Sequence, residues 1–299
     1  MSGRQQWSAY PETQKVTLSA IANFQEESPV VICVAPNGAR RSRKDHERIP
    51  LTPEELAREA VSCVEAGASV MHLHVRASDG GHSLDPAIYR SALAAIRAAV
   101  GQQLILQVTT ESAGRYAPPE QMAVIRELKP EAASVALREL IPDEAGERAA
   151  ADFFQFVVGE NIGLQFILYT PTEVARLMEL RERGVIPPAR HHALFVLGNY
   201  RDRVPSAPRS LLPFLWEWPT EWPWTVCAFG RSEAQCLAAA VSFGGHVRVG
   251  FENNLCNPDG TLAASNAALI ENISQIIDRT GRKRADVSQA RALYMPARG

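Results

Sequence analysis

Short apolar runs, most of them rich in Val and Ile, recur along the chain from residue 30 onward. Apolar runs of about four to eight residues that are bounded by turn residues are typical of buried strands. Because each run is followed by a longer stretch with helical spacing, we expect strands and helices to alternate. The eight expected strands are 30–36, 69–76, 103–110, 132–140, 163–170, 192–198, 224–230 and 246–251.

The stretches between these runs begin with residues that favour helix starts. Thr52 can cap a helix whose first turn holds Pro53, and Gly67 can end it. Strands that alternate with helices of about 10–15 residues predict a parallel sheet with right-handed crossovers. Similar helix starts are found at Asp85, Pro118, Thr170, Ser232 and Ser265.

The number of strand–helix repeats distinguishes a closed barrel from an open sheet. Eight repeats within about 250 residues fit a (β/α)8 TIM barrel of the α/β class, and this is the fold that we expect. No GxGxxG follows the first strand, which argues against an open dinucleotide-binding sheet. We expect an N-terminal extension over 1–28, a single barrel domain over 29–281 and a C-terminal tail over 282–299.

Charge and cysteine content limit the partners and the compartment. The chain has 31 Lys and Arg residues against 33 Asp and Glu residues, a formal net charge of −2, so we expect no nucleic-acid partner. Its five cysteines are an odd number without CxxC spacing, as suits a reducing compartment. The first residues lack the apolar core of a signal peptide, and no run has the length of a membrane span. We therefore expect a cytoplasmic protein with no membrane partner.

Two histidines alternate with apolar residues in the second expected strand. His72 and His74 project from one face of this strand, whereas Met71, Leu73 and Val75 project from the other. Two imidazoles at the C-terminal end of a barrel strand form a common platform for a metal ion. For so short a motif, a hydrogen-bonded histidine pair without a metal is the alternative.

A third ligand can come from the end of the eighth expected strand. Closure of the barrel brings this strand near the first two, so Glu252 can approach His72 and His74. A His2Glu set leaves a position open for substrate, as catalytic zinc sites do. The alternative for Glu252 is a solvated loop carboxylate. Arg248 shares the inward face of the strand by parity and would place a permanent cation beside the metal.

Polar residues also follow the first and third expected strands, at the end where barrels place their active sites. Arg40 follows the first strand, and Thr109, Thr110 and Glu111 lie at the end of the third. Hydroxyl and backbone N–H groups in these places suit carboxylate or carbonyl oxygens of a substrate. Taken singly, each segment also fits an ordinary turn.

The other five histidines are expected to have structural roles. We interpret His46 and His82 as loop residues. His191, His192 and His246 open their strands at the N-terminal end of the barrel, the end that contributes stability in this fold.

Segments with a specific pattern follow one another along the whole expected barrel. They are Gly38-Ala39, LTPEELA (51–57), EAGASVMHLHVR (65–76), QVTT (107–110), KPEAASV (129–135), FVLG (195–198), GGHVRVGFENN (244–254), PDGTLAASNAALIE (258–271) and ARAL (290–293). Taken in order, they resemble the β-keto acid cleavage enzyme family from about residue 29 to 294. The resemblance is specific, because HLHVR and GGHVRVG are separated by the whole eightfold repeat.

The resemblance implies a zinc-dependent (β/α)8 barrel that is usually a homo-oligomer, a dimer or a tetramer. Arg248 looks like the active-site arginine, and Thr109 and Ser134 fall where family members place hydroxyl groups that hold the keto acid. The implied reaction condenses a β-keto acid with acetyl-CoA and gives acetoacetate and a new acyl-CoA. The three residues that look like metal ligands are His72, His74 and Glu252.

Two residues depart from the family pattern. Family members commonly have Asp after the zinc-binding Glu, whereas this chain has Asn253, whose amide is not a base. Glu111 is then a candidate base, and reduced activity or a different reaction are the alternatives. Where the aminohexanoate-cleaving member has Glu for the amino group of its substrate, this chain has Arg40. A cation there predicts a neutral or anionic substrate tail, such as that of a dicarboxylic β-keto acid, unless Arg40 pairs with a neighbouring acid.

Two other functions remain open from the sequence. A metal-dependent hydrolase of the amidohydrolase kind also has HxH in a barrel, but it usually places this pair on the first strand and adds His on strands five and six and Asp on strand eight. The second alternative is a barrel that retains its metal with reduced turnover, as Asn253 suggests.

Overall fold

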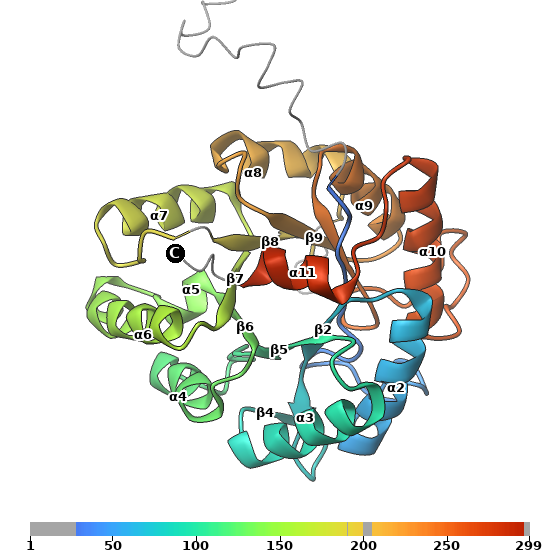
Figure 1. Cartoon of the computed structure of the whole chain (residues 1–299), viewed down its shortest axis with the longest axis horizontal. Coiled ribbons are helices and arrows are strands. Elements are labelled where there is room, and N and C mark those ends of the chain that lie inside the picture. The colour runs from blue at the N-terminus through green and yellow to red at the C-terminus, as the bar shows by residue number, and fades with distance from the viewer. Residues whose placement is uncertain (1–27, 190, 200–204, 296–299) are drawn as a thin grey trace, which may run out of the picture.

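Eight parallel strands close into a ring in the computed structural model, which describes residues 28–189, 191–199 and 205–295. They are hydrogen-bonded in the order β1-β10-β9-β8-β7-β6-β5-β2, and β2 pairs with β1 to close the barrel (Figure 1). Each strand lies within one of the expected runs, so the predicted (β/α)8 barrel is confirmed. The strands are β1 Ile32–Val34, β2 Val70–Leu73, β5 Ile105–Thr109, β6 Ala132–Ala136, β7 Gly163–Leu168, β8 His192–Leu197, β9 Trp224–Ala228 and β10 His246–Val249.

Helices between the strands cover the outside of this barrel (Figure 1). The first of them, α2 (Pro53–Ala66), begins with a capping box between Thr52 and Glu55 and ends at Gly67, whose φ is 109°. Within the described part of the chain, no helix has the length and apolar character needed to cross a membrane. The other long helices are α3 Pro86–Val100, α4 Pro118–Leu128, α6 Glu147–Gly159, α7 Pro171–Glu182, α9 Glu233–Ser242 and α10 Asn266–Arg279.

The sequence prediction was wrong at the end of the fourth expected strand. The run 132–140 is not one strand, because β6 ends at Ala136 and a one-turn helix, α5 (Leu137–Leu140), follows it. Leu137 and Leu140 are both buried. A spacing of three places two residues on one side of a helical turn but on opposite faces of a strand, so burial of both favours the helix. The elements that were not predicted include η1 Glu144–Gly146, η2 Pro208–Leu211 and α8 Leu212–Glu217.

The C-terminal segment covers the N-terminal end of the barrel. Helix α11 (Val287–Tyr294), within the expected tail 282–299, lies across the centre of the strand ring in Figure 1. Ala290 and Tyr294 are buried against the first residues of several strands. The opposite end, where the strands end and which we call the mouth, carries the predicted site. The expected extension 1–28 lies outside the described residues except for Ser28.

Candidate active site

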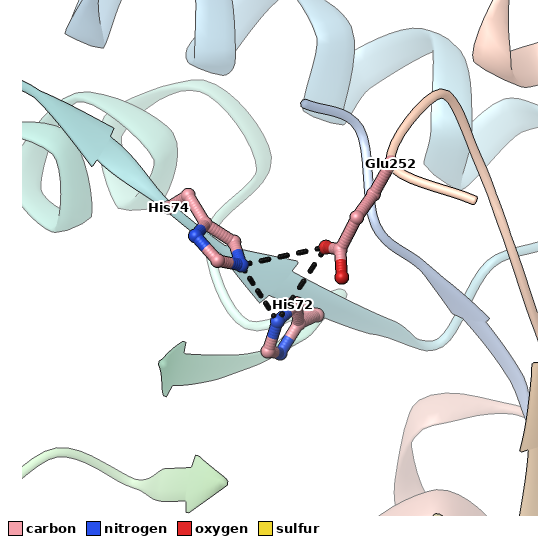
Figure 2. A group of neighbouring side chains, drawn as sticks. All are labelled: His72, His74 and Glu252. Carbon is pink, nitrogen blue, oxygen red and sulfur yellow. Dashed lines mark hydrogen bonds and ion pairs between the residues drawn. The ribbon is translucent and has the colours of Figure 1, made fainter. Parts of the chain in front are cut away.

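The two predicted histidines and Glu252 meet at the mouth of the barrel (Figure 2). His72 lies on β2, His74 follows this strand directly, and Glu252 lies in the turn after β10, with β1 between the two strands. The Nε2 atoms of the histidines are 3.1 Å apart, and Glu252 Oε2 lies 3.6 Å from that of His72 and 3.4 Å from that of His74. The three ligand atoms lie within 4.8 Å of one another. One ion with bonds of about 2.0–2.2 Å can therefore reach all three.

This donor set has the ionisation that a divalent metal requires. Burial lowers the pKa of His72 to about 3, so its imidazole is neutral at pH 7. The pKa of Glu252 is held well below its usual value, because Arg248 and the two histidines outweigh the opposing effect of burial. Glu252 Oε2 is buried and makes no hydrogen bond within the described chain. A neutral His72 imidazole beside a carboxylate oxygen that makes no hydrogen bond fits zinc or a similar divalent ion.

A row of hydrogen bonds crosses the barrel interior from His72. Its Nδ1 lies 2.8 Å from Gln107 Oε1, and Gln107 Nε2 donates to Gln165 Oε1 at 3.2 Å. Gln165 Nε2 lies 3.1 Å from His192 Nε2 and donates to the Tyr294 hydroxyl oxygen at 3.3 Å. Because the oxygen of Gln107 can only accept, the proton of His72 lies on Nδ1 and its Nε2 keeps a lone pair for a metal. This row, from His72 to Tyr294, supports the ligand from the interior of the barrel.

Arg248 is fixed beside the ligand set, as parity predicted. Its side chain is buried, and Nη2 donates to Glu252 Oε1 at 2.9 Å and to Cys227 Sγ at 3.5 Å. Burial lowers the pKa of Arg248, but Cys227 and Glu252 raise it by more, so the guanidinium stays charged. Nε and Nη1 are buried without a hydrogen-bond partner among the described residues. Buried N–H groups of a cation that lack an acceptor are costly, so an anionic oxygen bound at Nε and Nη1 would be stabilised.

Glu111 and Arg40 meet next to the same ligands. Glu111 Oε2 lies 3.8 Å from His74 Nε2, and Oε1 lies 3.6 Å from Arg40 Nη2. Burial raises the pKa of the Glu111 carboxyl, and the nearby Glu252 carboxylate adds to this effect. The Arg40 side chain is 72% exposed. Arg40 therefore pairs with a neighbouring acid, which is the alternative that the sequence left open.

The predicted hydroxyl residues lie on two neighbouring strands. Thr109 and Ser134 are paired in register on β5 and β6, and both are buried. Ser134 Oγ has no hydrogen-bond partner within the described chain, whereas Thr109 Oγ1 accepts from the Glu111 backbone N–H at 3.1 Å. Thr110 instead donates its hydroxyl to the Ser134 carbonyl oxygen at 2.9 Å, so it ties the strands together. Asn253, next to Glu252, is fully buried.

His82 belongs to the site, and the sequence did not predict this. It lies on β4 (His82–Ser83), which pairs with β3 (Val75–Arg76) in a short hairpin, so its interpretation as a loop residue was wrong. Its ring centroid is 5.2 Å from that of His74, and its Nε2 donates to the Glu111 carbonyl oxygen at 2.8 Å. The Asp-Gly-Gly sequence at 79–81 is a hairpin signal that could have indicated this return of the chain.

Arg76 holds the turn after β1 against the ligand set. Its Nη1 donates to the Ala39 carbonyl at 2.8 Å, and its Nη2 donates to the carbonyls of Gly38 and, at 2.9 Å, Arg41. Gly38 has a φ of 62°, and a Cβ atom there would lie 2.5 Å from Glu252 Cγ. The turn thus packs directly on a metal-ligand candidate, and only glycine fits at its closest point.

The arrangement differs from the hydrolase alternative. That pattern places histidines near the ends of the fifth and sixth barrel strands, where the described residues of β7 and β8 present Ile167 and Val196 instead. The last strand is followed by Glu252 rather than Asp. Among the described residues, the candidate ligand set comes from β2, the residue that follows it and the turn after β10.

Known proteins resemble this chain over almost its whole length. A family model described as beta-keto acid cleavage enzyme matches residues 29–295. The chain is 31% identical over 269 residues to the 3-keto-5-aminohexanoate cleavage enzyme of Acetoanaerobium sticklandii, covering 88% of this chain and 97% of that protein. It is 29% identical over 278 residues to the 3-oxoadipate:acetyl-CoA acetyltransferase of Cupriavidus necator, covering 89% and 94%.

Solved structures share the fold at lower identity. The apo structure of ObcA matches with a TM-score of 0.65 and 16% identity, covering 83% of this chain and 65% of that one. This likeness supports the barrel architecture alone. The sequence matches are more specific, because they extend from before the first strand to the last helix. The chain therefore belongs to the β-keto acid cleavage enzyme family and is an enzyme of this class.

Proposed function

We propose that the protein is a zinc-dependent enzyme that condenses a β-keto acid with acetyl-CoA and releases acetoacetate and a new acyl-CoA. The name of the acetyl-CoA acetyltransferase relative supports the co-substrate, and the cluster of His72, His74 and Glu252 supports the metal. One observation carries the proposal furthest. Next to this cluster lies a buried arginine, Arg248, with two guanidinium nitrogens that have no partner in the described chain.

The proposed reaction begins at the CH2 group between the carboxylate and the ketone of the β-keto acid. A metal bound by the His2Glu set would act as a Lewis acid on the ketone oxygen and make this carbon more acidic. A base removes a proton, and the carbanion forms a bond to the acetyl carbonyl carbon. The CoA sulfur then leaves the acetyl carbon and adds to the original ketone carbon. Cleavage of the bond between the former ketone carbon and the former CH2 carbon then releases acyl-CoA. Protonation of the carbanion that remains on the former CH2 carbon gives acetoacetate.

Arg248 is proposed to stabilise the negative charge that develops on oxygen in these steps. Its position is fixed by Glu252 and Cys227, so it does not need to reorganise when the charge appears. Ser134 Oγ, which has no partner among the described residues, is proposed to orient a substrate oxygen together with Thr109.

The base is proposed to be Glu111, since Asn253 has no basic group. Glu111 is supported by its position, with Oε2 3.8 Å from His74 Nε2 at the edge of the ligand set. The competing proposal is a barrel that binds metal and has reduced turnover because Asn253 replaces the family Asp.

The first test separates metal binding from chemistry. Protein purified without chelator should hold one zinc or similar ion per chain, and addition of a β-keto acid and acetyl-CoA should release acetoacetate. His74→Ala should lose both the metal and the turnover. Arg248→Lys should keep the metal and lose about 10²- to 10³-fold in kcat, as removal of an oxyanion-stabilising donor does. Absence of any divalent ion from the wild-type protein would contradict the proposal at its first step.

The second test concerns the base. Glu111→Gln should lower kcat by about 10²-fold or more, the usual contribution of a general base, with the metal content unchanged. Asn253→Asp is the matched variant for the competing proposal. A wild-type protein as active as Asn253→Asp would exclude reduced turnover, whereas a large gain in the variant would favour it. Full activity of Glu111→Gln would place the base elsewhere.

We also propose a homo-oligomer in the cytoplasm. The five cysteines are all free, which suits a reducing compartment. Leu212 and Trp216 lie one turn apart on α8 and are 49% and 77% exposed, and a contact between chains there would bury both. Light scattering of wild type and Trp216→Glu tests this contact, since the variant should dissociate.

A further inference from the structure

Half of the mouth is lined by apolar side chains. We call this set, which faces inward on β6, β7, β8 and β9, the apolar arc. Ile167 and Val196 on its surface keep 8% and 4% exposure, whereas the outward-facing Phe166 and Phe195 on the same strands keep none. The arc therefore lies at the open end of the barrel interior rather than under the helices. Its members are Ala136, Ile167, Leu194, Val196 and Cys227.

The apolar arc joins the polar half of the mouth at both of its ends. Ala136 lies two residues after Ser134 on the inner face of β6 and pairs in register with Ile167 on β7. At the other end, Cys227 Sγ accepts a hydrogen bond from the Arg248 nitrogen that also donates to Glu252. A molecule held at the ligand set and by Arg248 would therefore extend its remaining atoms over the apolar arc.

Two exposed arginines near this rim are already paired with acids. Arg40 lies 3.6 Å from the Glu111 carboxylate. The Arg138 guanidinium stacks 3.6 Å from the ring centroid of Tyr169 and lies 3.8 Å from the Glu173 carboxylate. To pair with either of these two arginines, an acidic tail would have to displace a carboxylate, and a charge placed on the apolar arc itself would be desolvated without a partner.

We propose that the substrate of this enzyme is a β-keto acid with an uncharged alkyl tail, and that the tail lies on the apolar arc. The inference rests on the proposed function and narrows the neutral or anionic tail expected from Arg40 to a neutral one. The two relatives described above are named for substrates that carry an amino group or a second carboxyl group. This chain would differ from both in the chemistry of the tail.

A substrate panel of matched length tests the inference. We expect kcat/KM for 3-oxohexanoate to exceed that for 3-oxohexanedioate by about tenfold or more, because the second carboxylate would lose its hydration on the arc. From 3-oxopentanoate to 3-oxoheptanoate, each added CH2 should raise kcat/KM about threefold. A preference for the dicarboxylic acid, with acetoacetate still formed, would overturn the tail inference alone. No acetoacetate from any member of the panel would overturn the proposed function and, with it, this inference.

A pair of isosteric variants tests the place of the tail. Val196→Thr puts a hydroxyl on the apolar arc without a change in shape, and kcat/KM for 3-oxoheptanoate should fall about tenfold. The value for 3-oxopentanoate, whose tail is shorter, should change less than about twofold. Val226→Thr is the matched control, because Val226 lies on β9 but is buried in the outer core cluster away from the arc. Equal effects of the two variants, or equal effects on both substrates, would show that the tail does not lie on the arc.

Discussion

At the scale of single residues, Gln107 decides which nitrogen of His72 can bind a metal. Its oxygen accepts from Nδ1, and its amide nitrogen is held in turn by Gln165. Groups that orient a metal ligand in this way typically contribute about 10- to 100-fold to metal affinity. Gln107→Leu should therefore weaken zinc binding by that factor, as measured by competition with a chromophoric chelator.

Two further variants distinguish a loss of His72 orientation from a general loss of folded structure. Gln107→Glu keeps an accepting oxygen and should recover most of the affinity for zinc. Gln103→Leu makes the same exchange at an exposed position after α3 and should bind zinc like the wild type. Normal zinc affinity in Gln107→Leu would show that the row of hydrogen bonds does not orient His72.

The sequence identified the ligand candidates but not the residues that support them. His72 and His74 are visible because a spacing of two on an apolar strand is a local signal, and Glu252 follows the last strand. Gln107 is one polar residue in an apolar run, and its role exists only once β2 and β5 lie side by side. His192 was assigned to the structural end of the barrel, and its contact with Gln165 likewise exists only once β7 and β8 pair.

At the scale of elements, the turn after β1 behaves as part of the ligand set. Gly38→Ala should push Glu252 aside, since a Cβ atom has no room there, and should weaken zinc binding by about tenfold or more. Gly281→Ala is the matched control, because Gly281 also has a positive φ, 80°, with nothing within 4 Å of its added Cβ.

Both glycine variants should lose about 1 kcal/mol of folding free energy from the backbone conformation alone. Chemical denaturation measures that loss, and chelator competition measures the metal. A loss of zinc affinity in Gly281→Ala as large as in Gly38→Ala would contradict a local effect on Glu252.

The type of an element could be predicted from the sequence where its apolar residues followed one clear pattern. The eight strands are enriched in β-branched residues and bounded by turn residues, and all eight were recognised. The segment after β6 was not, because Leu137 and Leu140 fit an extended apolar run as well as a helical turn. Only the packing at the strand end, which buries both leucines, distinguishes the two.

At the scale of the whole molecule, buried histidines make stability depend on pH. Burial lowers the pKa of His191 to about 4, against a hydrogen bond to the Pro187 carbonyl that acts in the opposite direction. In the unfolded chain the His191 imidazole therefore takes up a proton near pH 6.5, whereas in the folded chain it stays neutral until the pH approaches 4. The contribution of neutral His191 to the free energy of unfolding is complete above about pH 6.5. It is lost as the pH falls towards 4, and the total loss is about 3 kcal/mol.

His191→Gln removes this titration and keeps a side-chain donor for the Pro187 carbonyl. Unfolding free energies measured in guanidinium chloride between pH 7 and 4.5 should fall by about 2 to 3 kcal/mol less in the variant than in the wild type. The other histidines are present in both proteins and cancel in the difference. Parallel pH profiles would show that His191 does not contribute.

Helix α11, which covers the N-terminal end of the barrel, is synthesised after all eight barrel strands. On the ribosome, His72 and His74 emerge long before Glu252, and Tyr294 emerges after Glu252. The ring cannot close before β10 pairs with β1, and the row of hydrogen bonds behind His72 is complete only when α11 docks. We therefore expect the proposed ligand set to capture its metal only after α11 has emerged and docked.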